Sequence, residues 1–192
     1  MKKISTLLVL LGFAFISAGM ISCKKDDPVD PGDGDGGDGG GTTDLTTLSE
    51  GSQTFSGNLS TGAKLSDLSW AWDSGMACFV EPVKNQYKGN HVFYKINLPD
   101  HSTIDIYLRP SNASHEMSLY GYSKGAGSSE LPPSISSCVS CESSPSANGL
   151  PTTGEQHIYL NAVTNPYSII LGVAGADALT SGAYEIEIVV ES

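Results

Sequence analysis

Two short motifs and one aromatic pair carry the residue types that could do chemistry. The first motif, Gly-x-Ser-x-Gly at residues 121–125, is the spacing of a nucleophile elbow, in which a sharp turn from a strand into a helix exposes a serine, here Ser123. The segment that follows, AGSSELPPSISS, is poor in helix-forming residues. We therefore interpret 121–125 as a turn that closes a strand, with a small hydrolase using Ser123 as a less favoured alternative.

The second motif is a Cys-x-x-Cys pair formed by Cys138 and Cys141, with Cys78 as the other cysteine of the domain. In an exported protein these spacings favour a disulfide, either between Cys138 and Cys141 or between one of them and Cys78. Two alternatives are a set of thiols and a zinc site. A zinc site needs a fourth ligand, which the sequence offers only among scattered histidines, namely His91, His101, His115 and His157.

The aromatic pair is Trp70 and Trp72, followed directly by Asp73. If this segment is a strand, the two indoles point to the same face because side chains alternate along a strand. Exposed rings beside a carboxylate could hold a sugar by stacking and hydrogen bonding. Burial in the core is the alternative, since tryptophan removes a large apolar area from water when it is buried.

The elements that must position these residues are mostly strands. Apolar residues recur at every second position in several segments, whereas the helical period is almost absent. Segments 92–98 and 103–108, separated by Pro99-Asp100, predict a hairpin or adjacent antiparallel strands. The same alternation predicts further strands around 117–122, 158–160, 167–173 and 184–190, whereas residues 123–154 predict a long loop. Short strands separated by Gly, Pro, Ser and Asn predict an all-β, antiparallel sandwich.

The order of these strands resembles a known family. HVFYKINL, STIDIYL, EMSLYGY, NPYSIILGVAG and SGAYEIEIVV, over residues 88–190, resemble the bacterial pre-peptidase C-terminal domain. The resemblance implies a jelly-roll β-sandwich that binds polysaccharide or protein or assists secretion. The family often carries Asp-x-x-Leu before the end of its middle strand, but Glu116 stands there in this chain, so the resemblance does not carry a calcium site over to this chain. We predict no metal site and no cofactor.

The N-terminus predicts the compartment. Lys2 and Lys3 precede an apolar stretch that ends at Cys23, which is the arrangement of a secretory signal peptide. The end of that stretch, Met-Ile-Ser-Cys, resembles the lipobox of bacterial lipoproteins, in which the cysteine carries a diacylglycerol. The following Lys-Lys-Asp-Asp resembles a tag for export to the outer face of the outer membrane. Residues 1–22 are thus predicted to be a lipoprotein signal peptide, and Cys23 the lipidation site.

Residues 23–44 are predicted to form a disordered linker, because PVDPGDGDGGDGGGTTD contains almost nothing to bury. Residues 45–192 then form the β-sandwich domain, with six Lys and Arg against fourteen Asp and Glu. An acidic domain without a basic stripe excludes nucleic acid as a partner.

These observations predict an outer-membrane lipoprotein, lipid-anchored and facing the cell exterior, whose domain binds without catalysis. Its expected partners are the membrane, through Cys23, and a polysaccharide or a surface protein. Trp70, Trp72 and Asp73 are the predicted ligand-binding residues. The main alternative is an accessory subunit of an outer-membrane complex.

Overall fold

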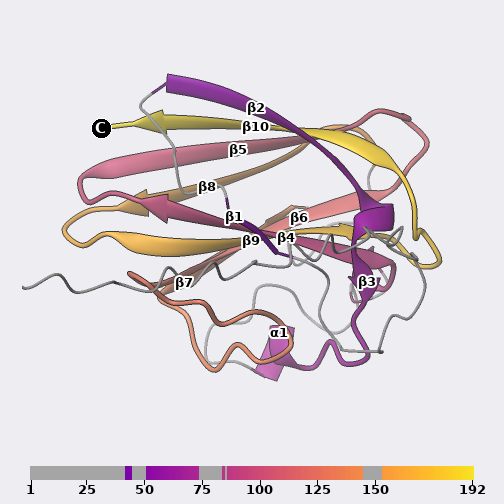
Figure 1. The fold of residues 1–192 in the computed structure, drawn as a ribbon, viewed down its shortest axis with the longest axis horizontal. Coiled ribbons are helices and arrows are strands. Elements are labelled where there is room, and N and C mark those ends of the chain that lie inside the picture. Colours follow the sequence, from indigo (N-terminus) through magenta and orange to yellow (C-terminus); the bar gives the residue numbers. More distant parts are fainter. Residues whose placement is uncertain (1–41, 45–50, 74–83, 85, 145–152) are drawn as a thin grey trace, which may run out of the picture. The chain divides into compact units, whose positions relative to one another are not determined.

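The computed structural model describes residues 42–44, 51–73, 84, 86–144 and 153–192. Most of these residues form two β-sheets that pack face to face (Figure 1). The signal peptide, Cys23 and most of the linker, together with Cys78, lie outside the described residues. The described part contains no helix long and apolar enough to cross a membrane.

Sheet A is the larger sheet, and four of its strands follow in the order β4 (Asn90–Leu98), β9 (Tyr167–Gly175), β6 (Met117–Gly125) and β7 (Ser140–Ser144). The short strands β1 (Thr42–Asp44) and β3 (Ala63–Lys64) also pair with β4. Sheet B has the order β2 (Gly51–Asn58), β10 (Ala183–Glu191), β5 (Ser102–Pro110) and β8 (Gln156–Ala162). The remaining elements are the 3₁₀ turn η1 (Leu59–Thr61) and the one-turn helix α1 (Trp70–Asp73).

The chain changes sheet after most strands, and β10 returns to lie between β2 and β5. This arrangement of eight antiparallel strands in two sheets is a jelly roll, so the predicted fold class is confirmed. The predicted pairing of 92–98 with 103–108 is wrong, because β4 belongs to sheet A and β5 to sheet B. At this crossover His101 has φ 54° and Ser102 Oγ donates to the carbonyl of Pro99 at 2.6 Å.

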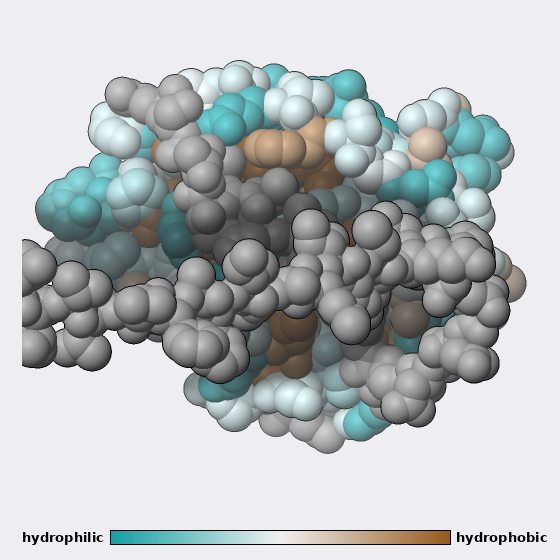
Figure 2. All heavy atoms as spheres, in the orientation of Figure 1, coloured by the Kyte–Doolittle hydropathy of each residue, from teal (hydrophilic) through white to brown (hydrophobic). Residues whose placement is uncertain are grey.

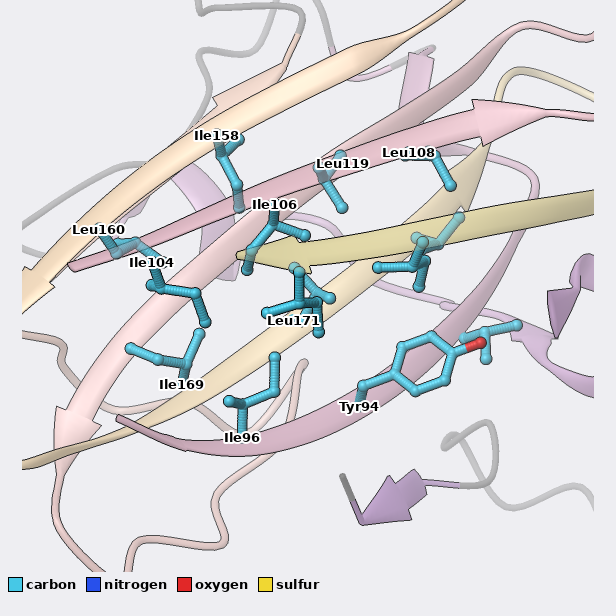
Figure 3. Close-up of a cluster of buried hydrophobic side chains, with 14 of the residues drawn as sticks. Tyr94, Ile96, Ile104, Ile106, Leu108, Leu119, Ile158, Leu160, Ile169 and Leu171 are labelled. Carbon is cyan, nitrogen blue, oxygen red and sulfur yellow. The ribbon is translucent and has the colours of Figure 1, made fainter. Parts of the chain in front are cut away.

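The core lies between the two sheets. Alternate residues of β4, β6 and β9 meet alternate residues of β5, β8 and β10 there (Figure 3), and the labelled side chains are almost fully buried. Val, Ile and Leu dominate this layer because branched side chains pack well on a pleated surface. The same alternation that predicts the strands therefore also determines which side chains enter the core.

The two sheets differ in what their outward faces bury. In β5, β8 and β10 only alternate residues are buried, whereas in β6 and β9 almost every residue is. A strand that is buried on both faces needs a second layer over its sheet. In sheet A that layer includes α1, which lies on the side of the sheet away from sheet B (Figure 1).

Several elements differ from the sequence prediction, among them β1, which lies at the end of the predicted linker 23–44 and pairs with β4. The predicted loop 123–154 contains the end of β6 and all of β7, and Thr153 forms an isolated bridge with Glu116. β2 was not predicted at all, because GSQTFSGN has a single large apolar residue. The segment that carries Trp70 is a helical turn rather than a strand.

Candidate binding surfaces

The outward face of sheet A is covered by an aromatic layer, which we call the covered face. Tyr120 and Tyr122 project outward from β6, and Trp70 and Tyr87 pack over them from the segment before β4. The indole of Trp70 lies 5.4 Å from the ring of Tyr122 and 5.9 Å from that of Tyr120, both in tilted geometry. Such aromatic contacts add stability beyond the area they bury.

Trp70 is only 6% exposed, so its side chain is buried rather than presented to a ligand. Because α1 is helical, the strand geometry that would place both indoles on one face does not occur in this segment. Trp70 therefore cannot form the predicted exposed platform. The side chains of Trp72 and Asp73 lie outside the described residues, and their role in ligand binding stays a prediction.

A buried histidine joins this layer to sheet A. The Nε2 atom of His91 lies 2.5 Å from the carbonyl of Tyr87, and its Nδ1 atom lies 2.8 Å from the hydroxyl of Tyr120. A carbonyl oxygen can only accept, so Nε2 carries the hydrogen and Nδ1 accepts from Tyr120. Burial lowers the pKa of His91 to about 4, which keeps the ring neutral near pH 7.

Glycine permits the close packing under this layer. A Cβ atom at Gly172 in β9 would lie 2.2 Å from the ring of Tyr120. The ring of Tyr120 therefore rests directly on the backbone of the neighbouring strand. Any side chain at position 172 would displace that ring and disturb its hydrogen bond to His91.

The two predicted chemical motifs do not form the sites that their spacing suggested. Ser123 lies within β6, is fully buried and is not followed by a helix, so the nucleophile-elbow hypothesis is wrong. Cys138 keeps its thiol, so the predicted Cys138–Cys141 disulfide is also wrong. Because Cys78 lies outside the described residues, a bond between Cys78 and Cys141 stays a prediction. No group of three metal-binding side chains occurs in the described part.

The segment that carries Cys138 is held to β6 by an ion pair between the buried Lys124 and the exposed Glu130. The Nζ atom of Lys124 lies 3.0 Å from Oε2 of Glu130 and also donates to the carbonyl of Ser137. Glu130 additionally accepts hydrogen bonds from the backbone and side chain of Ser136. These hydrogen bonds and Lys124 lower the pKa of Glu130 to about 2. The long segment after β6 therefore covers sheet A as a structured element.

The outward face of sheet B, which we call the open face, is different. None of its outward side chains is buried. They come from β2, β10, β5 and β8, and they are Ser52, Thr54, Ser56, Glu185, Glu187, Val189, Asp105, Tyr107, Arg109, His157, Tyr159 and Asn161. Aromatic, carboxylate and hydroxyl groups are thus presented together on one sheet surface.

An aromatic and cationic ladder crosses the centre of the open face. Tyr107 of β5 stands opposite His157 of β8, with ring centroids 4.5 Å apart and ring planes 17° apart. The guanidinium of Arg109 lies 5.5 Å from the ring of Tyr107. Beside this ladder, Tyr159 is 45% exposed and stands opposite Asp105. Tyr159 is the large aromatic group that this face offers most fully to solvent.

Charged hydrogen bonds fix the orientation of the ladder. Arg109 Nε lies 2.6 Å from Oε2 of Glu155, and its Nη1 lies 2.7 Å from Oε2 of Glu187. Glu187 also accepts a hydrogen bond from Ser52 at 2.9 Å, and Arg109 together with this bond lowers the pKa of Glu187. His157 Nε2 lies 2.7 Å from Oδ1 of Asp105. Groups held in this way are prepared to receive a polar ligand with little loss of conformational freedom.

The sandwich also has a hollow at one edge, between β2 and β4. It has a volume of about 540 Å³ and is lined mainly by residues 54–58 together with Val92 and Tyr94. On the face that Figure 2 turns to the viewer, brown hydrophobic residues lie beneath teal hydrophilic ones. The phenols of Tyr94 and Tyr184 are hydrogen-bonded to each other at 2.8 Å, and this bond joins the two sheets.

The sequence contained a signal for the open face. Strands β5, β8 and β10 alternate strictly, which predicts one solvated face, and their solvated positions include Tyr107, His157 and Tyr159. What the sequence could not supply is the pairing of β5 with β8, which brings these rings together. Because these residues are about fifty positions apart along the chain, the sequence pattern alone does not predict that they form one cluster.

No protein-family model matches the chain, and no curated protein does. Three solved structures resemble it at low identity. The first is the Aeromonas hydrophila PliG, a periplasmic lysozyme inhibitor of g-type lysozyme, with a TM-score of 0.40 and 9% identity over 78% of this chain and 96% of that chain.

The second is the pre-peptidase C-terminal domain of collagenase from Bacillus anthracis, with a TM-score of 0.37 and 12% identity over 79% of this chain and 95% of that chain. The third is CorA, a surface-associated copper-binding protein of Methylomicrobium album BG8, with a TM-score of 0.42 and 9% identity over 80% of this chain and 98% of that chain. Likeness at this level carries no argument for family membership or for a shared ligand.

Proposed function

We propose that this protein is a non-catalytic glycan-binding module and that its ligand lies on the open face of sheet B. One observation carries this proposal, namely the cluster of Tyr107, His157 and Tyr159 with carboxylates beside the rings. Aromatic rings stack on the apolar faces of sugar rings, and carboxylates accept hydrogen bonds from sugar hydroxyls. An extended sheet surface suits several consecutive sugar units of a polysaccharide.

The proposed ligand is neutral or cationic rather than acidic. The open face carries the carboxylates of Asp105, Glu185 and Glu187, with Glu155 at its rim. Arg109 is already paired with three of these four groups. An acidic polysaccharide would meet like charges there, which disfavours binding. Hydroxyl-rich sugars and amino sugars meet hydrogen-bond acceptors instead.

We further propose that the domain is held at the outer membrane by a lipid on Cys23 and faces the cell exterior. A diacylglycerol anchor supplies stable attachment because each buried CH₂ contributes about 0.8 kcal/mol. The expected result is that Cys23→Ala abolishes labelling by radioactive palmitate and releases the protein from the membrane fraction. Membrane attachment and labelling of the Cys23→Ala variant would contradict the anchor without affecting the glycan proposal.

The binding proposal is tested by thermal unfolding of the full chain with a panel of neutral polysaccharides and amino-sugar polymers. A ligand present at about one hundred times its Kd stabilises the native state by about 2.7 kcal/mol, which raises Tm by several degrees in a domain of about 150 residues. We expect Tyr159→Ala to remove this shift. Val163→Ala is the matched control, since Val163 is 66% exposed but lies outside β8.

An equal loss of the shift in Val163→Ala, or a shift that survives in both Tyr159→Ala and Tyr107→Ala, would exclude the open face as the site. If no polysaccharide gives a shift, the glycan proposal is wrong, and the accessory-subunit alternative becomes the leading one. That alternative predicts a protein that co-purifies with the chain from solubilised membranes.

A further inference from the structure

Several lysine side chains lie together on a second surface, away from the open face. Residues 45–192 contain only six Lys and Arg against fourteen Asp and Glu. Three of these six, Lys64, Lys84 and Lys88, line one pocket of about 520 Å³. We call it the lysine pocket, and its other lining residues are Leu65, Ser66, Asp67, Leu68 and Asp177. Half of the cations of an acidic domain thus converge on one concave site.

The fold holds the walls of this pocket in place through one asparagine. Lys64 ends β3 and pairs with Asn90 at the start of β4. The side-chain amide of Asn90 donates to the carbonyls of Leu59, Gly62 and Thr180, at 3.0–3.1 Å. These bonds join the segment before Lys64, the start of β4 and the segment that contains Asp177. Lys88 lies two residues before Asn90, so its backbone is close to the position that these hydrogen bonds fix.

Two of the three ammonium groups lack a counter-charge within the described residues. Lys64 and Lys88 form no ion pair there, whereas Arg109 and Lys124 pair with carboxylates. The carboxylate of Asp67 is directed to Ser69 rather than to a lysine, because its two oxygens accept hydrogen bonds from the backbone and hydroxyl of Ser69, and these bonds lower the pKa of Asp67. Three lysines against the two carboxylates of Asp67 and Asp177 leave this concave site with a net positive charge, which attracts an anion.

From these observations we infer that the lysine pocket binds an anionic sugar unit, with a carboxylate or phosphate group between Lys64 and Lys88. Lysine is a common point-charge ligand for phosphate and carboxylate groups. The volume lies within the range of small-molecule pockets. Leu65 and Leu68 supply apolar wall against which a sugar ring can lie, and Ser66 supplies a hydroxyl.

The ligand inferred here is anionic, whereas the ligand proposed for the open face is neutral or cationic, so the two sites are separable by experiment. Isothermal titration of the full chain at low salt uses four probes, namely trigalacturonic acid, glucose 6-phosphate, neutral maltotriose and inorganic phosphate. We expect at least one of the two charged sugars to bind, and neither maltotriose nor inorganic phosphate to match it.

The test variant is the double substitution Lys64→Gln with Lys88→Gln, which should weaken binding of the charged sugar by about tenfold. Lys95→Gln is the matched control, because it removes one positive charge from β4 outside the pocket. Tyr159→Ala should leave this binding unchanged. An equal loss in Lys95→Gln, tighter binding of maltotriose or inorganic phosphate, or no binding of either charged sugar would overturn the inference.

Discussion

The covered face and the open face belong to one sandwich, yet they use their aromatic residues in opposite ways. On the covered face Tyr120 is fully buried and its hydroxyl is bound to His91. On the open face Tyr159 is 45% exposed and belongs to an edge strand. The two tyrosines differ in exposure because β6, which carries Tyr120, is buried on both faces, whereas β8, which carries Tyr159, is buried on one face.

The lesson is that an aromatic residue in a sandwich has to be judged by its strand. Strictly alternating strands keep one face in water, and aromatic residues on that face are available to a ligand. A sheet whose strands carry apolar residues on both faces needs a second layer of residues over its outward face. Nearby aromatic residues then pack in that layer instead of binding a ligand. Trp70 belongs to that second case.

The largest expected difference between the faces is in stability. Tyr120→Ala removes a fully buried ring and the hydrogen-bond partner of His91, so we expect it to lower the free energy of unfolding by about 3–5 kcal/mol. Tyr159→Ala should change it by no more than about 0.5 kcal/mol. Urea unfolding of both variants measures the difference. Equal losses in the two variants would show that the open face is also packed.

The next effect is the pH dependence of stability on the covered face. The pKa of His91 is about 4 in the folded state and about 6.5 when unfolded. The stabilisation is thus fully present above pH 6.5 and is lost as the pH falls toward 4, by about 3 kcal/mol in total. Unfolding measured between pH 7 and pH 5 lies above the titration of most carboxylates, so the change in stability there reports mainly on histidine.

A matched pair of variants assigns that pH dependence to one residue. His91→Gln should lose the fall in stability between pH 7 and pH 5. His101→Gln, which alters a histidine exposed at the β4–β5 turn, should keep it. A fall that persists unchanged in His91→Gln would mean that another group titrates and that His91 is not held neutral by burial.

The smallest expected effect concerns the ion pairs of the open face. Arg109→Ala removes exposed pairs to Glu155 and Glu187, and such pairs contribute little in water. We expect Tm to fall by about 1–3 °C at low ionic strength and by less in about 1 M salt, where exposed charges are screened. A loss as large as that of Tyr120→Ala would contradict the solvated character of this face.

Most of the fold could be predicted from the sequence, because alternation in segments such as 103–108 and 184–190 determines both strand and core face. The assignment of strands to sheets could not, because β4 and β5 are neighbours in sequence but cross between sheets at Pro99–Ser102. The weakly apolar β2 was also missed. Its place is determined by pairing with β10 rather than by its own pattern.

The candidate sites were less predictable than the fold. The sequence directed attention to Trp70 by residue type, but its exposure depends on the layer that covers sheet A. The open face and the lysine pocket unite residues far apart in the chain, such as Tyr107 with His157 and Lys64 with Lys88. Such sites depend on strand pairing, which single-sequence periodicity does not specify.

The most direct test of the open face as the binding surface is hydroxyl-radical footprinting of the full chain, with and without the polysaccharide that gives the largest thermal shift. Without ligand, Tyr159 should be oxidised, whereas the buried Tyr87, Tyr120 and Tyr122 should be protected. With ligand, Tyr159 should become protected and the other three should not change. Oxidation of Tyr159 that is unaffected by bound polysaccharide would contradict the account.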